Sequence, residues 1–275
     1  MCAATATLAR PAAAARDENP QSELDLALAA FQPISLTEMD GVALLDRRDT
    51  KYVVRTADAL AAMAEVASAY RVLEIDGRRA HHYRTVYFDT PDLALFRAHH
   101  RDEPGRYKVR CRQYIDSALT VLEVKQRDKR GRTAKRRLHT GRMVEVIGKH
   151  ERPFLEKHGA LPQAGLMVRL ENEFRRVTLV SEVRPERLTI DFGLAFRANG
   201  ETVLLPGLVV VEVKEPGGTR ESDFARALRA RRIRPRRFSK YCIGIALTEA
   251  DVKHNLFNPD LRYVLNLTER QCHER

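Results

Sequence analysis

Charged and apolar residues alternate within a predicted hairpin between residues 120 and 137. Glu123 and Lys125 share one parity of its first half, and Lys135 and Arg137 share one parity of its second half. In a β-strand, residues of one parity point to the same face. The D-K-R-G stretch between the halves has the composition of a turn. The pattern therefore predicts two strands with a cationic face that also carries a carboxylate, and on a single hairpin such a face is most often simply solvated.

The same alternation recurs in other stretches of the chain. They contain Lys108, Arg110 and Arg112, then Arg187, Thr189 and Asp191, and finally Glu212 and Lys214. If these faces converge, they form an electropositive cavity that holds one or two carboxylates. Such a cavity suits a partner with many phosphates together with a divalent metal. Separate solvated faces on the individual strands are the alternative interpretation.

Hydrophobic periodicity predicts both strands and helices along the rest of the chain. Besides the hairpin, strands are predicted at 44–55, 81–90, 105–114, 171–180, 186–196 and 203–215. Helical segments are predicted within 22–46, at 56–70, 92–97, 140–159 and 221–232, and from about residue 236 onwards, with Ser239 near the start of the last helix. At 275 residues, the chain is long enough for one large β-rich domain or two small ones.

Composition narrows the class of partner. The chain has 48 Lys and Arg against 37 Asp and Glu, a net charge of +11, so an acidic partner is expected. It contains no Trp and no aromatic-rich basic motif, so nucleic acid is not the expected partner. No Walker A loop, G-x-G-x-x-G or H-E-x-x-H motif occurs. The cysteines form no C-x-x-C pair and no apolar run approaches the ~20 residues of a membrane span, so we expect a cytoplasmic protein.

Five short motifs together resemble a known family. They are T-K-Y-V-V at 50–54, Y-F-D-T-P-D at 87–92, R-Y-K-V-R-C-R at 106–112, L-E-V-K at 122–125 and F-S-K-Y-C-I-G at 238–244. Their order and spacing resemble the VTC domain, the catalytic domain of the vacuolar transporter chaperone polyphosphate polymerases and their bacterial relatives. That family belongs to the triphosphate tunnel metalloenzymes. The resemblance implies an α+β fold, in which an eight-stranded antiparallel β-barrel with flanking helices surrounds a charged interior.

The resemblance covers roughly residues 40–250, and together with the composition of the N-terminal stretch it predicts an organisation in three parts. We expect a tunnel domain at 23–252, preceded by a disordered N-terminal tail at 1–22 and followed by a C-terminal tail at 253–275. A transit peptide is the alternative for the first segment. The E-x-E-x-K signature of the tunnel superfamily is degenerate here, because Arg47 and Asp49 precede Lys51. This departure disfavours a plain triphosphatase and fits the polymerase branch.

Site residues follow from the resemblance, motif by motif. The catalytic, phosphate-binding cations would be Lys51, Arg110, Arg112, Lys125, Lys135, Arg176, Arg187 and Lys240. Glu212 would be the metal ligand, with Glu123 as the next candidate, and Arg237 and Lys214 would bind the cofactor. The expected metal is Mn²⁺ or Mg²⁺. Two assignments rest on a looser alignment, because Arg137 could replace Lys135 and Arg175 could replace Arg176.

The activity implied is transfer of the γ-phosphoryl group of ATP to a growing polyphosphate chain, with ATP and polyphosphate as partners. A triphosphatase or nucleotide cyclase of the same fold is one alternative. A non-catalytic module that binds polyanions is another. Peripheral attachment at the membrane, through a membrane protein, stays open beside the cytoplasmic location, and so does the oligomeric state.

Overall fold

The computed structural model describes residues 20–40, 47–129, 132–217 and 221–273. Most of the segment predicted as an N-terminal tail lies outside these residues, and helix α1 begins at Pro20. The strands are β1 (Gln32–Ile34), β2 (Arg47–Arg55), β3 (Tyr70–Leu73), β4 (Ala80–Asp89), β5 (Tyr107–Tyr114), β6 (Leu119–Arg127), β7 (Thr133–His139), β8 (Met167–Ser181), β9 (Arg187–Ala198), β10 (Glu201–Leu205) and β11 (Leu208–Pro216). Every predicted strand is therefore present.

Eight of these strands form one antiparallel path in the order β2-β11-β9-β8-β4-β5-β6-β7. Of the other three, β3 and β10 add to β8 and β9, and β1 pairs with β3. The expected antiparallel sheet is thus present, but within the described residues no pairing joins β2 to β7, so the barrel is not closed. The reason lies at the free edge of β2, where Arg236 N donates to Lys51 O (2.8 Å) and the Tyr263 hydroxyl donates to Val53 O (3.2 Å).

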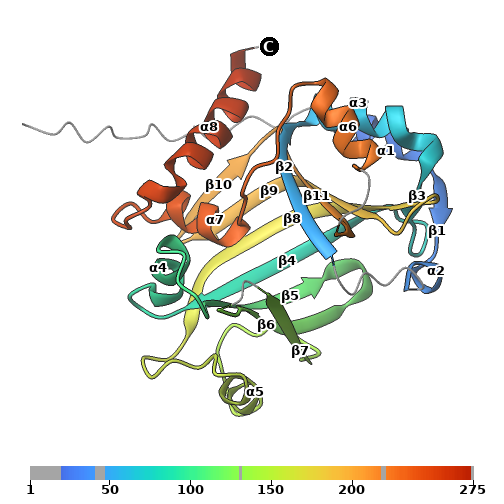
Figure 1. The fold of residues 1–275 in the computed structure, drawn as a ribbon. Coiled ribbons are helices and arrows are strands. Elements are labelled where there is room, and N and C mark those ends of the chain that lie inside the picture. Colours follow the sequence, from blue (N-terminus) through green and yellow to red (C-terminus); the bar gives the residue numbers. More distant parts are fainter. Residues whose placement is uncertain (1–19, 41–46, 130–131, 218–220, 274–275) are drawn as a thin grey trace, which may run out of the picture.

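Helices pack on both faces of this sheet in separate groups (Figure 1). The helices are α1 (Pro20–Ala29), α2 (Leu36–Asp40), α3 (Thr56–Val66), α4 (Ala94–His100), α5 (Arg152–Lys157), α6 (Asp223–Ala230), α7 (Lys240–Thr248) and α8 (Asn258–His273). Apolar residues of α1, α3 and α6 pack with the outward side chains of β2, β8, β9 and β11. A second core covers β4, β5 and β6 beside α5. Helices α7 and α8 pack on the inner face at one end of the sheet. None of the described helices is long and apolar enough to cross a membrane.

One helical prediction needs correction. Within 140–159 only α5 is helical, because Pro153 starts a short helix there and Gly159 ends it with a φ of +59°. Residues 253–275, expected to be a C-terminal tail, contain α8. Its Leu261 and Val264 are 1 % exposed, since their spacing puts an apolar stripe against the core around α7.

Two glycines let the inner face take its shape. Gly193 in β9 has a φ of +61°, at the point where the pairing of β8 with β9 shifts register. The extra residue keeps both Asp191 and Leu194 on the inner face. Gly244 allows α7 to lie close on β8 and β9, because a Cβ there would lie 2.4 Å from a methyl carbon of Leu170 and 2.7 Å from the ring of Phe196. The helix thereby reaches the interior of the curved sheet.

Candidate functional site

The charged parity of the strands faces the interior of the sheet. On β5, Val109 and Cys111 pack in the outer core, so Arg110 and Arg112 point to the other side. Burial lowers the pKa of Lys125 on β6, and the nearby charge of Lys51 on β2 lowers it further. Cations from strands far apart in the sheet order therefore meet in one space.

Glu123 on β6 is the centre of one cationic group. Its carboxylate accepts hydrogen bonds from Arg110 Nε (2.7 Å) and Arg137 Nε (3.1 Å), and it pairs with Lys135. Burial alone would raise the pKa of Glu123, but the surrounding cations outweigh it and hold the pKa well below its usual range. Burial and the charges of Arg110 and Arg137 lower the pKa of Lys135 to about 7, against the pull of Glu123.

Asp191 on β9 is the centre of a second group. Arg176 on β8 donates to both of its oxygens, at 2.6 and 2.8 Å, and Lys240 of α7 also donates to it. The guanidinium of Arg176 lies 5.2 Å from the ring centroids of both Tyr83 and Phe174. Burial would raise the pKa of Asp191, yet the two cations hold it low, and burial lowers the pKa of Lys240 to about 8. The pair is bidentate and buried, so Arg176 has a fixed orientation.

Glu212 on β11 is the centre of a third group. Its carboxylate lies 2.8 Å from Lys214 Nζ and 3.7 Å from Lys51 Nζ. Lys214 also donates to Thr189 Oγ1 at 3.2 Å. Burial would raise the pKa of Glu212, but both lysines hold it well below its usual range. At neutral pH this carboxylate is ionised and can act as a ligand.

The start of α7 enters the same interior. Ser239 caps the helix by accepting from Cys242 N (3.2 Å), and Lys108 Nζ donates to Ser239 Oγ at 2.9 Å. Lys51 Nζ donates to Phe238 O at 2.9 Å. The N-terminal end of a helix carries partial positive charge, which adds to the charges of these lysines.

The structure brings together nearly all the predicted site residues. Interior contacts or charges join Lys51, Arg110, Arg112, Lys125, Lys135, Arg176, Lys214, Lys240, Glu123 and Glu212. Arg187 shares the parity of Asp191 and is paired in register with Lys214. Arg237 is exposed on the segment before α7, outside this group. The looser assignments resolve differently: Arg175 is exposed on the opposite face from Arg176, whereas Arg137 joins Lys135 at Glu123.

Two interior residues escaped the list of expected site residues. Lys108 is half-buried against the start of α7, where burial and neighbouring cations, chiefly Lys51, lower its pKa to about 8. Asp191 organises Arg176 and Lys240. The alternation of both strands already contained the signal, because each residue shares its parity with an expected site residue.

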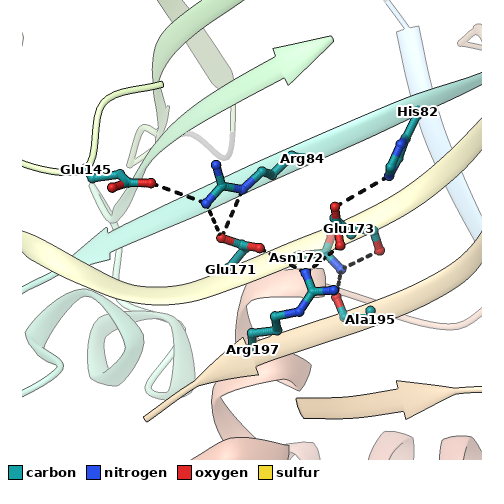
Figure 2. A network of polar contacts seen from close by, with 8 residues as sticks. All are labelled: His82, Arg84, Glu145, Glu171, Asn172, Glu173, Ala195 and Arg197. Atoms are coloured by element: carbon teal, nitrogen blue, oxygen red, sulfur yellow. Dashed lines mark hydrogen bonds and ion pairs between the residues drawn. The ribbon is translucent and has the colours of Figure 1, made fainter. Parts of the chain in front are cut away.

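The opposite face of the sheet carries a different kind of network (Figure 2). There, Arg84 pairs with Glu171 (2.6 Å) and Glu145 (3.2 Å), and Arg197 bridges Glu171 and Glu173. Three carboxylates meet two guanidinium groups in this network, and several of the side chains are largely exposed. The excess of positive charge is therefore a property of the interior.

A divalent metal is implied by the family, and Glu212 is the residue that best fits it. Among the described residues, no group of three or more His, Cys, Asp or Glu could hold a metal ion by itself. Mg²⁺ and related ions are commonly held by one or two carboxylates, with substrate phosphates completing the coordination. The ionised Glu212 fits that role, provided that a phosphate ligand supplies the remaining oxygens.

The family model of the VTC domain matches residues 46–249. No curated protein matches the chain.

Solved structures are similar only at low identity. A candidate adenylate cyclase from Bacillus halodurans is 15% identical with a TM-score of 0.45, and the alignment covers 70% of this chain and 94% of that chain. A candidate adenylyl cyclase from Hippeastrum with dominant triphosphatase activity is 15% identical with a TM-score of 0.43, over 75% of this chain and 100% of that chain. At these values neither likeness says anything about activity. The match of the VTC domain to most of the chain is decisive, and the protein belongs to the VTC domain family.

Proposed function

We propose that this protein is a polyphosphate polymerase, which transfers the γ-phosphoryl group of ATP to the end of a growing polyphosphate chain. The observation that supports it most is the convergence of lysines and arginines from strands β2, β5, β6, β7, β8 and β11 and from α7 on one interior. Cations outnumber carboxylates there. A ligand with several closely spaced phosphates neutralises such a site better than a single anion.

The interior residues have distinct roles in this proposal. Arg110, Arg112 and Arg176 have planar guanidinium groups suited to paired contacts with phosphate oxygens, and carboxylates or aromatic rings already orient them. The lysines act as point charges that follow successive phosphates. We assign Lys214, and Arg237 on the exposed segment before α7, to the binding of the nucleotide. The ligands of the site in this proposal are ATP and polyphosphate.

In the transfer itself, a terminal phosphate oxygen of the chain bonds to the γ-phosphorus of ATP. The bond from that phosphorus to the β–γ bridging oxygen breaks, and ADP leaves with the bonding electron pair. In-line positioning and charge neutralisation are the main requirements of phosphoryl transfer. The terminal phosphate is already ionised, so no general base is required.

The metal has one contribution in this scheme. Glu212 would hold Mn²⁺ or Mg²⁺ together with the ligand, and the ion would supply positive charge to the phosphates. Glu123 is a weaker candidate as a ligand, because three cations already occupy its carboxylate. We propose that the reaction takes place in the cytoplasm, either with the protein free or with the protein attached to a membrane protein.

The test is incubation of the protein with ATP and Mn²⁺, followed by gel electrophoresis of the products for polyphosphate. Polymer with release of ADP is the expected result. Orthophosphate without polymer would indicate a triphosphatase, and cyclic nucleotide would indicate a cyclase. Binding of polyanions without any turnover would indicate a non-catalytic module. Glu173→Gln, which removes a carboxylate from the outer network, is the matched control for interior variants.

A further inference from the structure

Helix α8 lies outside the residues that match the family, since the match ends at residue 249 and α8 begins at Asn258. It is nevertheless packed on the domain: Leu261 and Val264 are buried in the same core as Phe238 and Tyr241. In Figure 1, α8 stands beside α7 at one end of the sheet. The helix therefore borders the segment that leads into the phosphate site.

One side chain links α8 to that segment. The guanidinium carbon of Arg236 lies 3.7 Å from the ring centroid of Tyr263, and Arg236 Nη1 lies 3.5 Å from Asp260 Oδ1. A guanidinium stacked this closely on an aromatic ring, with a carboxylate beside it, is held in one orientation. The Tyr263 hydroxyl also donates to Val53 O in β2. Residue 236 is thus held by two residues of α8.

The same segment holds Lys51 at both its backbone and its side chain. Arg236 N donates to Lys51 O at 2.8 Å, and Lys51 Nζ donates to Phe238 O at 2.9 Å. Lys51 has a further partner in Glu212 at 3.7 Å. Lys51 and Lys125 repel each other across the interior. Burial, and after it the charge of Lys51, lowers the pKa of Lys125. The position of the Lys51 ammonium group therefore depends on the carbonyl of Phe238, and so on the contacts that hold residues 236–238 in place.

We propose that α8 is a positioning element of the phosphate site: Tyr263 and Asp260 hold Arg236, and Arg236 fixes the 236–238 segment against which Lys51 is oriented. This inference rests on the proposed function only in assigning a polyphosphate ligand to the interior. Tyr263 and Asp260 do not touch that ligand. They act on it through Lys51, and the C-terminal helix becomes part of what sets affinity.

The test is isothermal titration of the full chain with tripolyphosphate, at a temperature well below the melting points of all variants. Tyr263→Leu removes the ring under Arg236, and the dissociation constant should rise roughly three- to tenfold, which corresponds to the net contribution of one ordinary hydrogen bond. Tyr263→Phe keeps the ring and should retain most of the affinity. Asp260→Asn removes the charge beside Arg236 and should weaken binding as well.

The control is Leu261→Ala, which removes buried packing from α8 but leaves the contacts of Arg236 intact. It should lower the melting temperature without changing the dissociation constant. Unchanged affinity in Tyr263→Leu, or an equal loss of affinity in Leu261→Ala, would overturn the inference. If Tyr263→Leu does not fold, Asp260→Asn decides in the same way. If the unmodified protein binds no tripolyphosphate, the proposed function is refuted as well. If the unmodified protein binds and the variants bind with the same affinity, the positioning role alone is refuted.

Discussion

Replacing Asp191 with Asn should be among the most destabilising single changes in the interior. Asp191 is 2 % exposed and accepts from Arg176 and Lys240. The amide has nearly the same shape but no charge, so Arg176 and Lys240 would lose the carboxylate that pairs with both of them. Glu173→Gln is the matched control, because Glu173 also has two basic partners, Arg197 and the imidazole of His82 (3.6 Å), but lies on the outer face of the sheet (Figure 2).

The expected magnitudes differ because burial differs. Removing one partner of a buried ion pair costs about 3–5 kcal/mol, since an uncompensated charge stays buried. An exposed ion pair contributes about 0–1 kcal/mol, and the side chains of Arg197 and His82 are 44% and 41% exposed. At roughly 3 °C per kcal/mol, Asp191→Asn should lower the melting temperature by about 10–15 °C. Glu173→Gln should lower it by no more than about 3 °C.

The assay is thermal unfolding of both variants with and without tripolyphosphate. Because the phosphates supply the missing negative charge, the ligand should restore more stability to Asp191→Asn than it adds to the unmodified protein. A ligand at ~100 times its dissociation constant adds about 2.7 kcal/mol by mass action alone. It should add nothing extra to Glu173→Gln, whose partners face away from the interior.

Two results would refute this reasoning. If Asp191→Asn unfolds at the same temperature as Glu173→Gln, the interior is solvated, and its cations do not depend on Asp191 for charge compensation. If tripolyphosphate stabilises Asp191→Asn less than the unmodified protein, Asp191 acts mainly by orienting Arg176 and Lys240. Charge balance would then be secondary to geometry.

Three further predictions concern metal, ligand and pH. Glu212→Gln should abolish Mn²⁺-dependent turnover and leave the fold intact by circular dichroism, and near-normal activity would place the metal elsewhere. Arg110→Ala combined with Arg112→Ala should reduce the rise in melting temperature caused by tripolyphosphate, and the assignment fails if orthophosphate at equal charge raises it as much. Binding of tripolyphosphate should weaken as pH rises through about 7 to 8, because Lys135 and Lys240, with pKa values of about 7 and about 8, lose their protons there. Titrations across this range that show constant affinity would contradict the last prediction.

The same pKa values have an opposite effect on the free protein. A lysine that loses its proton near pH 7 when folded, but only near pH ~10.4 when unfolded, makes the unfolded state the stronger proton binder between these values. The free energy of unfolding of the unliganded protein should therefore rise with pH over this window. Affinity and stability thus change in opposite directions with pH.

Alternation in the sequence predicted the interior because sheet geometry allows only two faces. Arg110 and Arg112 alternate with residues that fit a dry core, so one face had to be apolar and the other charged. The open barrel could not be predicted in this way. It depends on Arg236 and Tyr263, which occupy the edge of β2 from distant parts of the chain and leave no periodic signal.

The failed helix at 140–159 has a related cause. Val144, which lies outside α5, is fully buried beside the outer face of β5 and β6, so its hydrophobicity reports burial and not helical periodicity. Similarly, polar residues separate the buried apolar side chains of α8, which among the residues of described burial are Leu261, Val264 and Leu265. Local patterns predict faces of an element well, but tertiary packing decides whether a short apolar cluster becomes a helix.

The three interior carboxylates explain how so many cations can share one space and still bind a polyanion. Glu123, Asp191 and Glu212 each contact at least two cations, and they fix these cations in place without cancelling the positive excess. Donors that are oriented before the ligand arrives need little reorganisation on binding. The remaining repulsion destabilises the free protein, and a polyanion removes it. Part of the binding free energy therefore comes from relief of the repulsion among the interior cations. Neutralising an interior cation that does not pair with a carboxylate should accordingly raise the melting temperature of the free protein and weaken the binding of tripolyphosphate.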